Sequence, residues 1–189
     1  MEIDNLTERL KYALRKSDVQ QLASFFSAIP NGTDTLLKLS LSNNSQLAFH
    51  AAWVLEGCLL YNNSLLDAHA DRLVGVIPSL QNNSVRRHFC KLFKTWLATN
   101  QSKLSGWIDA RNGEVERLIE ACYNWLLSND VPVSVKAHCI EILSIMSNHY
   151  PWIAEELPNT IRFIQIDSTP GIKAMVRRIK KTGTRNGKA

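Results

Sequence analysis

Apolar residues recur along most of the chain at the spacing of one face of an α-helix. In the segment 85–97 the large apolar side chains follow the i, i+3, i+4, i+7 pattern that buries one side of a helix. No stretch of useful length alternates apolar and polar residues, which is the pattern of a half-buried strand. The periodicity therefore predicts an all-α protein.

Three of the helical segments superpose without a gap and carry a histidine at one equivalent position: His50, His88 and His138. The segment that begins at Ile172 continues the series, with Met175 in the histidine position. These positions are 38, 50 and 37 residues apart. The chain therefore contains an internal helical repeat.

A second apolar segment of helical length lies between successive repeat helices, at 71–81, 114–128 and 153–165. Each leads into a polar turn with hydroxyl side chains that can cap the next helix, namely Ser84, Ser134 and Ser168 or Thr169. Two helices in roughly 40 residues are typical of an α-solenoid.

The repeat helices open with Val or Ile and then Arg or Lys after a short polar turn, as in "SVRRHFCKLF", "SVKAHCIEIL" and "GIKAMVRRIK". This motif, recurring in phase with the helix pairs, resembles HEAT repeats over residues 44–181. The resemblance implies a HEAT/armadillo-like α-α superhelix, a right-handed solenoid of antiparallel helix pairs. We expect one domain over 1–181, with repeats at 1–43, 44–81, 82–129 and 130–181, and a disordered basic tail at 182–189.

A closer likeness rests on "AAWVLEGCLL", "LIEACYNWLLSND" and the basic final helix. These segments look like a family of short bacterial HEAT-like proteins that genome annotation often labels adenylosuccinate lyase. Lyases of that name carry a catalytic serine in a mobile loop of the form Ser-Ser-x-Met-Pro-x-Lys-x-Asn. The run "SIMS" at 144–147 lacks the Pro, Lys and Asn, so we assign no lyase residue.

The net charge of +5 is concentrated at one end of the chain. Seven basic residues and no acidic residue follow Asp167, whereas the chain up to Asp167 carries 15 basic and 17 acidic side chains. The body is therefore slightly acidic, which weakens an interpretation as a nucleic-acid-binding protein.

The four cysteines are far apart, and each lies in an apolar helical run, which predicts buried, reduced thiols. The first residues carry charges every few positions, and no apolar run reaches membrane-spanning length. We therefore expect a cytoplasmic protein with no membrane partner.

The three equivalent histidines raise the question of a zinc site. Equivalent positions on adjacent packed helices lie roughly 8–10 Å apart, whereas each ligand of one zinc ion lies about 2 Å from the metal. We therefore expect histidines that are partly buried and hydrogen-bonded between repeats, with no metal and no cofactor.

One repeat helix carries a row of cations that could contact phosphates: Arg86, Arg87, Lys91 and Lys94. The equivalent helix carries Ala137 and Glu141, so the row does not continue as a cationic groove. A solvated helix surface is the favoured interpretation, and binding of a polyanion is the alternative.

The helix at 47–60 is apolar nearly all round, which predicts burial between neighbouring helices, with Gly57 allowing a close approach. The alternative is that Phe49, Trp53 and Glu56 line a groove in which Glu56 binds a partner. In the last helix we expect a stripe to be buried, formed by Ile172, Met175, Val176 and Ile179.

No nucleophile elbow, phosphate-binding glycine loop or recognisable pair of carboxylates is present. The run "GWIDAR" places Trp107 and Asp109 beside Arg111, a combination that alkylpurine DNA glycosylases of HEAT-like fold use, but it falls in an expected inter-helix loop. We favour a non-enzymatic binding or scaffolding module for a protein partner. A nucleic-acid-binding protein of the DNA-repair type is the alternative, and the lyase label comes third.

Overall fold

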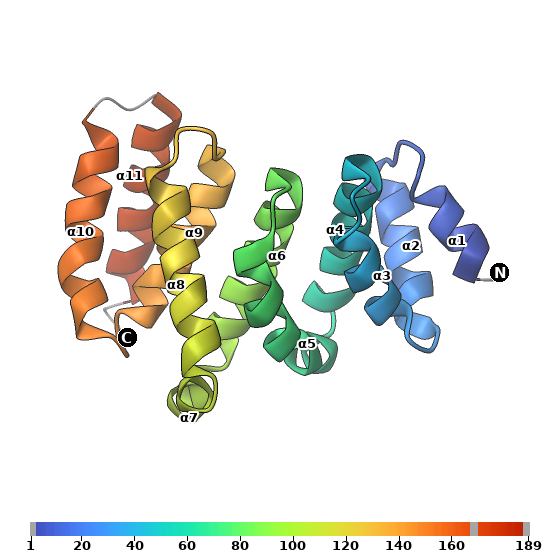
Figure 1. The fold of residues 1–189 in the computed structure, drawn as a ribbon, viewed down its shortest axis with the longest axis horizontal. Coiled ribbons are helices and arrows are strands. Elements are labelled where there is room, and N and C mark those ends of the chain that lie inside the picture. The colour runs from blue at the N-terminus through green and yellow to red at the C-terminus, as the bar shows by residue number, and fades with distance from the viewer. Residues whose placement is uncertain (1–2, 167–169, 187–189) are drawn as a thin grey trace. The chain divides into compact units, whose positions relative to one another are not determined.

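The computed structural model describes residues 3–166 and 170–186, and every regular element in these ranges is a helix, with no strand. The chain forms two compact units, unit 1 (Met1–Trp96) and unit 2 (Leu97–Ala189). Figure 1 shows the succession of helices along the chain. The all-α fold class predicted from the periodicity is confirmed.

Unit 1 is built from six α-helices and one short 3₁₀ helix among its described residues: α1 Ile3–Arg9, α2 Lys16–Ala28, α3 Gly32–Ser40, α4 Ser45–Leu60, α5 Asn63–Val76, η1 Ile77–Ser79 and α6 Asn83–Thr99. The boundary between the units falls within the last turns of α6. The predicted repeat 82–129 therefore spans both units.

Helix α4 is the centre of unit 1 and packs against both α2 and α3. A Cβ atom added at Gly57 would lie 2.9 Å from the Cβ of Ala23 on α2, which is closer than carbon atoms normally approach. The predicted close approach at Gly57 is confirmed, and it brings α2 directly against the backbone of α4.

Asparagine side chains begin three of the helices in unit 1. The Asn44 side chain accepts a hydrogen bond from the Leu47 amide at 3.0 Å, and Asn62 does the same for Leu65 at 3.1 Å. At α6 the Asn82 side chain accepts from the Ser84 amide at 2.9 Å, so the prediction that Ser84 caps this helix was wrong. Asparagine caps a helix as well as serine does, and Asn82 stands one residue before the first helical residue.

Unit 2 contains five α-helices and one 3₁₀ helix among its described residues: η2 Gln101–Lys103, α7 Leu104–Asp109, α8 Asn112–Leu127, α9 Val133–Met146, α10 Pro151–Gln165 and α11 Pro170–Asn186. Helix α9 is its centre and packs against α8, α10 and α11. Met175 and Val176 of α11 are buried, and Ile172 and Ile179 are half-buried, as the apolar stripe predicts.

Several element boundaries differ from the sequence predictions. Helix α5 begins at Asn63 rather than 71, because the Asn62 cap starts it a full two turns earlier. Ser134 lies inside α9, which follows Pro132 and has no side-chain cap, so the cap predicted there was wrong. The alternative caps Ser168 and Thr169 lie outside the described residues.

The last helix continues to Asn186, into the segment 182–189 where we predicted disorder. No proline interrupts the helix in this segment. Residues 187–189 lie outside the described part of the chain.

All four cysteines are buried free thiols, as predicted. Within 3–166 and 170–186, no helix combines the length and the apolar character needed to cross a membrane.

Candidate functional site

The three equivalent histidines are anchored in two different ways. His50 Nδ1 lies 2.8 Å from the carbonyl oxygen of Leu10, and His88 Nδ1 lies 2.7 Å from Glu56 Oε2 on α4. Both confirm the predicted hydrogen bonds to a preceding repeat. His138 instead contacts Glu141 of its own helix at 3.0 Å. For His138 the prediction of a contact between repeats was wrong, because Glu141 supplies a nearer acceptor one turn away.

Glu56 is the hub of a partly buried ionic cluster in unit 1. Its Oε2 contacts His88, and its Oε1 accepts a hydrogen bond from Lys91 Nζ at 2.6 Å. The exposed fraction of the side chain is 12% for Glu56 and 3% for His88. Burial alone would raise the pKa of the Glu56 carboxyl, but the hydrogen bonds from His88 and Lys91 outweigh it and hold the pKa below its ordinary value of 4.5. Both carboxylate oxygens are thus engaged within the unit.

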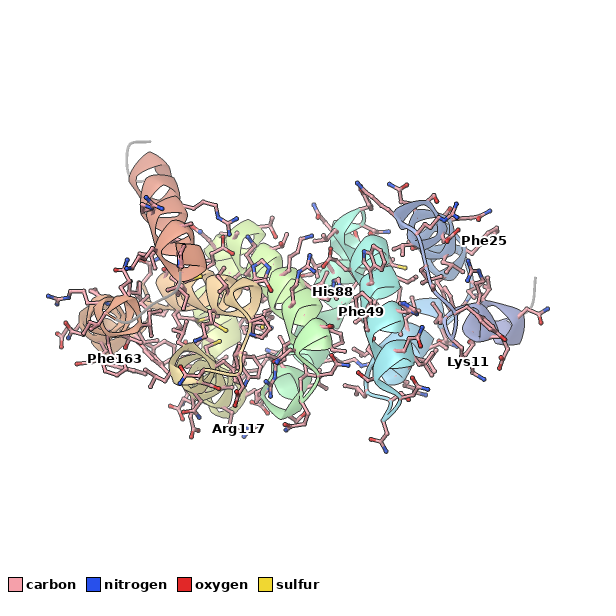
Figure 2. All side chains as sticks on the ribbon, turned by 90° about the horizontal axis from the view of Figure 1, so that it is seen from above. Lys11, Phe25, Phe49, His88, Arg117 and Phe163 are labelled. Carbon is pink, nitrogen blue, oxygen red and sulfur yellow. The ribbon has the colours of Figure 1, made fainter. Side chains whose placement is uncertain are left out.

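Aromatic rings cover this cluster. Phe49 stacks on Trp53, with ring centroids 5.7 Å apart, and on the His88 ring at the same distance. Figure 2 shows Phe49 and His88 side by side between α4 and α6. The structure therefore brings together Trp53, Glu56 and Lys91 from our sequence candidates, and it uses Glu56 and Lys91 to join α4 to α6.

The remaining cations of α6 are divided between internal contacts and solvent. The Arg86 guanidinium donates from Nε to the Leu80 carbonyl at 2.7 Å and from an Nη atom to Asn83 at 2.8 Å. Lys94 is half-buried and also has an interaction partner. Arg87 is exposed. Two members of the row, Arg86 and Lys91, thus stabilise the fold directly.

The "GWIDAR" run lies in unit 2, away from the residues of that cluster in the sequence. Trp107 and Asp109 belong to α7, so the prediction that this run is a loop was wrong. The sequence gives little sign of this helix, because the segment is short and Gly106 is a poor helix former. In the structure α7 follows directly after the 3₁₀ helix η2. The Arg111 guanidinium lies 5.2 Å from the centre of the Trp107 ring, a cation–π contact that occupies this aromatic face.

Unit 2 contains a cavity of about 790 Å³ between the α8–α9 connection, the end of α10 and the start of α11. Such a volume is in the usual range of ligand pockets. Its wall combines aliphatic and aromatic side chains with an amide and two charged side chains: Leu126, Leu127, Asn129, Asp130, Val131, Pro132, Val133, Lys136, Phe163, Ile164, Ile166 and Ile172. We call this hollow the Lys136 cavity.

Lys136 is the buried charge in this wall. Only 4% of the residue is exposed, and burial lowers the pKa of its amine below the ordinary value of 10.5. Within the described residues we find no hydrogen bond or ion pair to this amine. The aliphatic stem accounts for this burial, because the amine nitrogen is not among the buried side-chain atoms that lack a partner in the described part of the chain, which are His69 Nε2, His88 Nε2 and the Tyr123 hydroxyl.

The rim of the Lys136 cavity exposes large apolar side chains. Leu127 is 52% exposed, Phe163 65% and Ile166 70%, and all three line the cavity. Figure 2 labels Phe163 on α10. An exposed apolar cluster of this kind marks an interaction site more often than an isolated exposed residue does.

A smaller hollow of about 360 Å³ in unit 2 is lined by aromatic and acidic residues. Tyr123 and Trp152 stack with centroids 5.7 Å apart, and Glu116 and Glu120 stand beside them. Burial, with smaller contributions from Glu116 and Asp109, raises the pKa of Tyr150 in this wall.

Sequence reasoning missed the Lys136 cavity. One signal was available, because Lys136 stands at the position of Arg86 in the aligned repeats. The structure leaves Arg86 half-buried at this position and buries Lys136. The exposure of Phe163 and Ile166 had no such signal, since both look like core residues near a helix end.

No group of three or more histidine, cysteine, aspartate or glutamate side chains suited to a metal ion occurs in the part of the chain that the structure describes.

Comparison of the sequence with curated proteins and with solved structures gave no match. The family model for a HEAT repeat domain matches residues 6–183, which includes every helix from α2 to α10 in full. HEAT repeats are generally protein-interaction scaffolds, and the family is typically non-enzymatic. The match covers most of the chain and agrees with the paired helices of both units: this chain belongs to the HEAT repeat domain family.

Proposed function

We propose that this protein is a non-enzymatic binding module that holds a protein partner against the rim of the Lys136 cavity in unit 2. Membership of the HEAT repeat family supports a role in protein interaction in general. It does not by itself identify the surface that binds.

The observation that carries the choice of surface is the cluster of Leu127, Phe163 and Ile166 around one hollow. Large apolar side chains next to a cavity can be desolvated together by a partner, and such clusters supply most of the affinity of protein interfaces.

The alternative of nucleic-acid binding through α6 has less support from the contacts. Lys91 is paired with Glu56, and Arg86 donates to the Leu80 carbonyl. A phosphate would have to compete with both contacts, and the loss of either would weaken the fold.

The test is an affinity capture with matched surface variants, using cells that naturally produce the protein. Phe163→Ser removes the aromatic side chain at the rim, and Tyr61→Ser removes an even more exposed aromatic residue from unit 1, where Tyr61 is 86% exposed. We expect one partner to be retained by the wild type and by Tyr61→Ser and to be lost from Phe163→Ser.

The captured partner is then purified, and its dissociation constant is measured for each variant. Loss of a hot-spot aromatic residue should weaken binding by about 2 kcal/mol, close to thirtyfold. Equal binding by all three proteins would show that the rim of the Lys136 cavity is not the interface.

A further inference from the structure

The smaller hollow of unit 2 combines aromatic rings with carboxylates. We call it the Trp152 hollow, and its wall consists of Glu116, Ile119, Glu120, Tyr123, Asn124, Tyr150 and Trp152. Its volume of about 360 Å³ lies at the lower end of the usual range of ligand pockets. None of these residues lines the Lys136 cavity, so a ligand bound here would occupy a separate surface.

The carboxylates of the Trp152 hollow have no cation paired with them in the described part of the chain. Glu116 and Glu120 are exposed and lie one turn apart on the same face of α8. Glu116 accepts a hydrogen bond from the Asn112 side chain at 2.9 Å, and Glu120 has neither a hydrogen bond nor an ion pair among the described residues. Arg117, the cation of α8, pairs instead with Glu114. The unmatched charge of this wall is therefore negative.

Trp152 adds a flat aromatic surface to the same wall. Its ring stacks on Tyr123 with centroids 5.7 Å apart and planes at 28°, yet the residue is still 47% exposed. In the same unit the Arg111 guanidinium lies over the Trp107 ring, whereas no cation lies over Trp152 among the described residues. Because the face of an indole attracts cations, this ring can accept one that the described residues do not supply.

The Tyr123 hydroxyl is a further unused group in this wall. Its oxygen is buried and makes no hydrogen bond in the described part of the chain, which is costly unless a ligand supplies a partner. Burial, with smaller contributions from Glu156 and Cys122, raises the pKa of this phenol. The hydroxyl therefore stays protonated at neutral pH, and its oxygen can accept a hydrogen bond from a ligand.

We propose that the Trp152 hollow binds an arginine side chain of a protein partner, with the guanidinium stacked on Trp152 and its N–H groups donating to Glu116 and Glu120. This inference goes beyond the interface proposed at the Lys136 cavity and does not rest on it.

Arginine fits this wall better than lysine or methylated lysine does. Its planar guanidinium can lie flat on an aromatic ring while its N–H groups donate sideways to carboxylates. Quaternary ammonium groups are instead recognised by cages of several rings. The rings of Tyr123 and Trp152 are close to parallel, so they form a platform rather than a cage.

The experiment titrates the isotope-labelled full-length protein with acetyl-Gly-Arg-Gly-amide and follows the Trp152 indole N–H signal by NMR. The matched control is the same peptide with citrulline, which keeps the shape of arginine without its charge. We expect the arginine peptide to bind at least about tenfold more tightly, the effect of one charge-assisted hydrogen bond.

Three variants of the full-length protein test the wall. Glu120→Gln removes one acceptor charge and should weaken binding of the arginine peptide about tenfold. Trp152→Leu removes the aromatic face and should also weaken it about tenfold, measured from the backbone amide signals of α8. Glu155→Gln removes an equal charge from α10 outside the wall and should change the dissociation constant by less than about twofold. Circular dichroism melts establish that the variants are folded.

Four results would overturn the inference. These are equal binding, or no binding, of the arginine and citrulline peptides, an arginine preference that survives Glu120→Gln or Trp152→Leu, tighter binding of the corresponding trimethyl-lysine peptide, and tighter arginine binding once Lys180, Lys181, Arg185 and Lys188 are replaced by glutamine. The last result would mean that the chain's own basic residues occupy the hollow. None of these results affects the capture experiment with Phe163→Ser, because Phe163 does not line the Trp152 hollow.

Discussion

Helices α6 and α9 are two copies of one repeat helix, yet they treat the same positions differently. On α6 the residue three places after His88 is Lys91, and His88 contacts Glu56 on α4, the preceding repeat helix. On α9 the residue three places after His138 is Glu141, and the histidine pairs within its own helix. Two positions account for the difference, because the place of Lys91 is taken by Glu141 on α9, and the place of Glu56 is taken by Lys94 on α6.

The basic position at the start of each helix shows the same contrast. Arg86 is satisfied by backbone and side-chain oxygens near its own helix, whereas Lys136 is buried beside a cavity with no partner among the described residues. The Arg86 guanidinium therefore joins α6 to the turn before it, whereas Lys136 contributes to the packing of unit 2 through its buried aliphatic stem.

The largest difference between the two helices should appear when each glutamate is removed. Glu56→Ala leaves His88 buried without its acceptor and should lower the free energy of unfolding by about 3 kcal/mol. Glu141→Ala breaks a more exposed pair within one helix and should cost less than about 1 kcal/mol. Urea denaturation followed by circular dichroism measures both free energies of unfolding. Equal decreases would show that the contact between helices stabilises the protein no more than the contact within α9.

Neutralising the two equivalent cations should have effects of opposite sign. Arg86→Met loses the hydrogen bonds to Leu80 and Asn83 and should destabilise the protein by about 2 kcal/mol. Lys136→Met keeps an apolar stem in place and removes an amine whose pKa burial lowers, so it should stabilise the protein slightly, by less than about 1 kcal/mol. Thermal melts measure the sign of both changes in stability. A Lys136→Met protein with a lower melting temperature than the wild type would show that the Lys136 amine makes a stabilising contact in solution.

The close packing of unit 1 can be tested at its glycines. Gly57→Ala places a methyl group against Ala23 and should cost about 1–2 kcal/mol in spite of the better helix propensity of alanine. Gly75→Ala on α5 meets nothing within 4 Å, so it should stabilise the protein by about 0.5–1 kcal/mol. Chemical denaturation of the two variants under one set of conditions gives both signs.

The smallest effect is the pH dependence of the difference between the wild type and Lys136→Met. The pKa of Lys136 is lowered in the folded protein, so the folded state releases this proton before the unfolded state does. The wild type should therefore gain stability relative to Lys136→Met as the pH rises toward 10.5, the ordinary lysine value. Paired melts at pH 7 and pH 10 measure the change, and a constant or growing advantage of Lys136→Met contradicts it.

The helices and their repeat could be predicted because their signal is local. The apolar stripe of α6 and the aligned histidines depend only on spacing within one helix. Helix α7 was missed because its six residues carry too little periodicity and include a glycine. The early start of α5 was missed because Asn62 is also a common turn residue.

The candidate site depends on packing between helices, which spacing does not encode. The alignment placed Lys136 at the position of Arg86, but whether a buried cation finds an acceptor is decided by the backbone of the neighbouring turn. Phe163 and Ile166 fit a core stripe as well as a surface one. Their exposure follows from where α10 ends against the α8–α9 connection, a property of tertiary structure.

The buried thiols give each unit its own reporter of local opening. Cys58 and Cys90 lie in unit 1, and Cys122 and Cys139 lie in unit 2. Burial raises the pKa of the Cys58 thiol to about 11, so at neutral pH it is a poor nucleophile until its helix separates from its neighbours. Timed alkylation followed by peptide mass mapping would measure, in one native sample, how often the helices around the cysteines of each unit open locally.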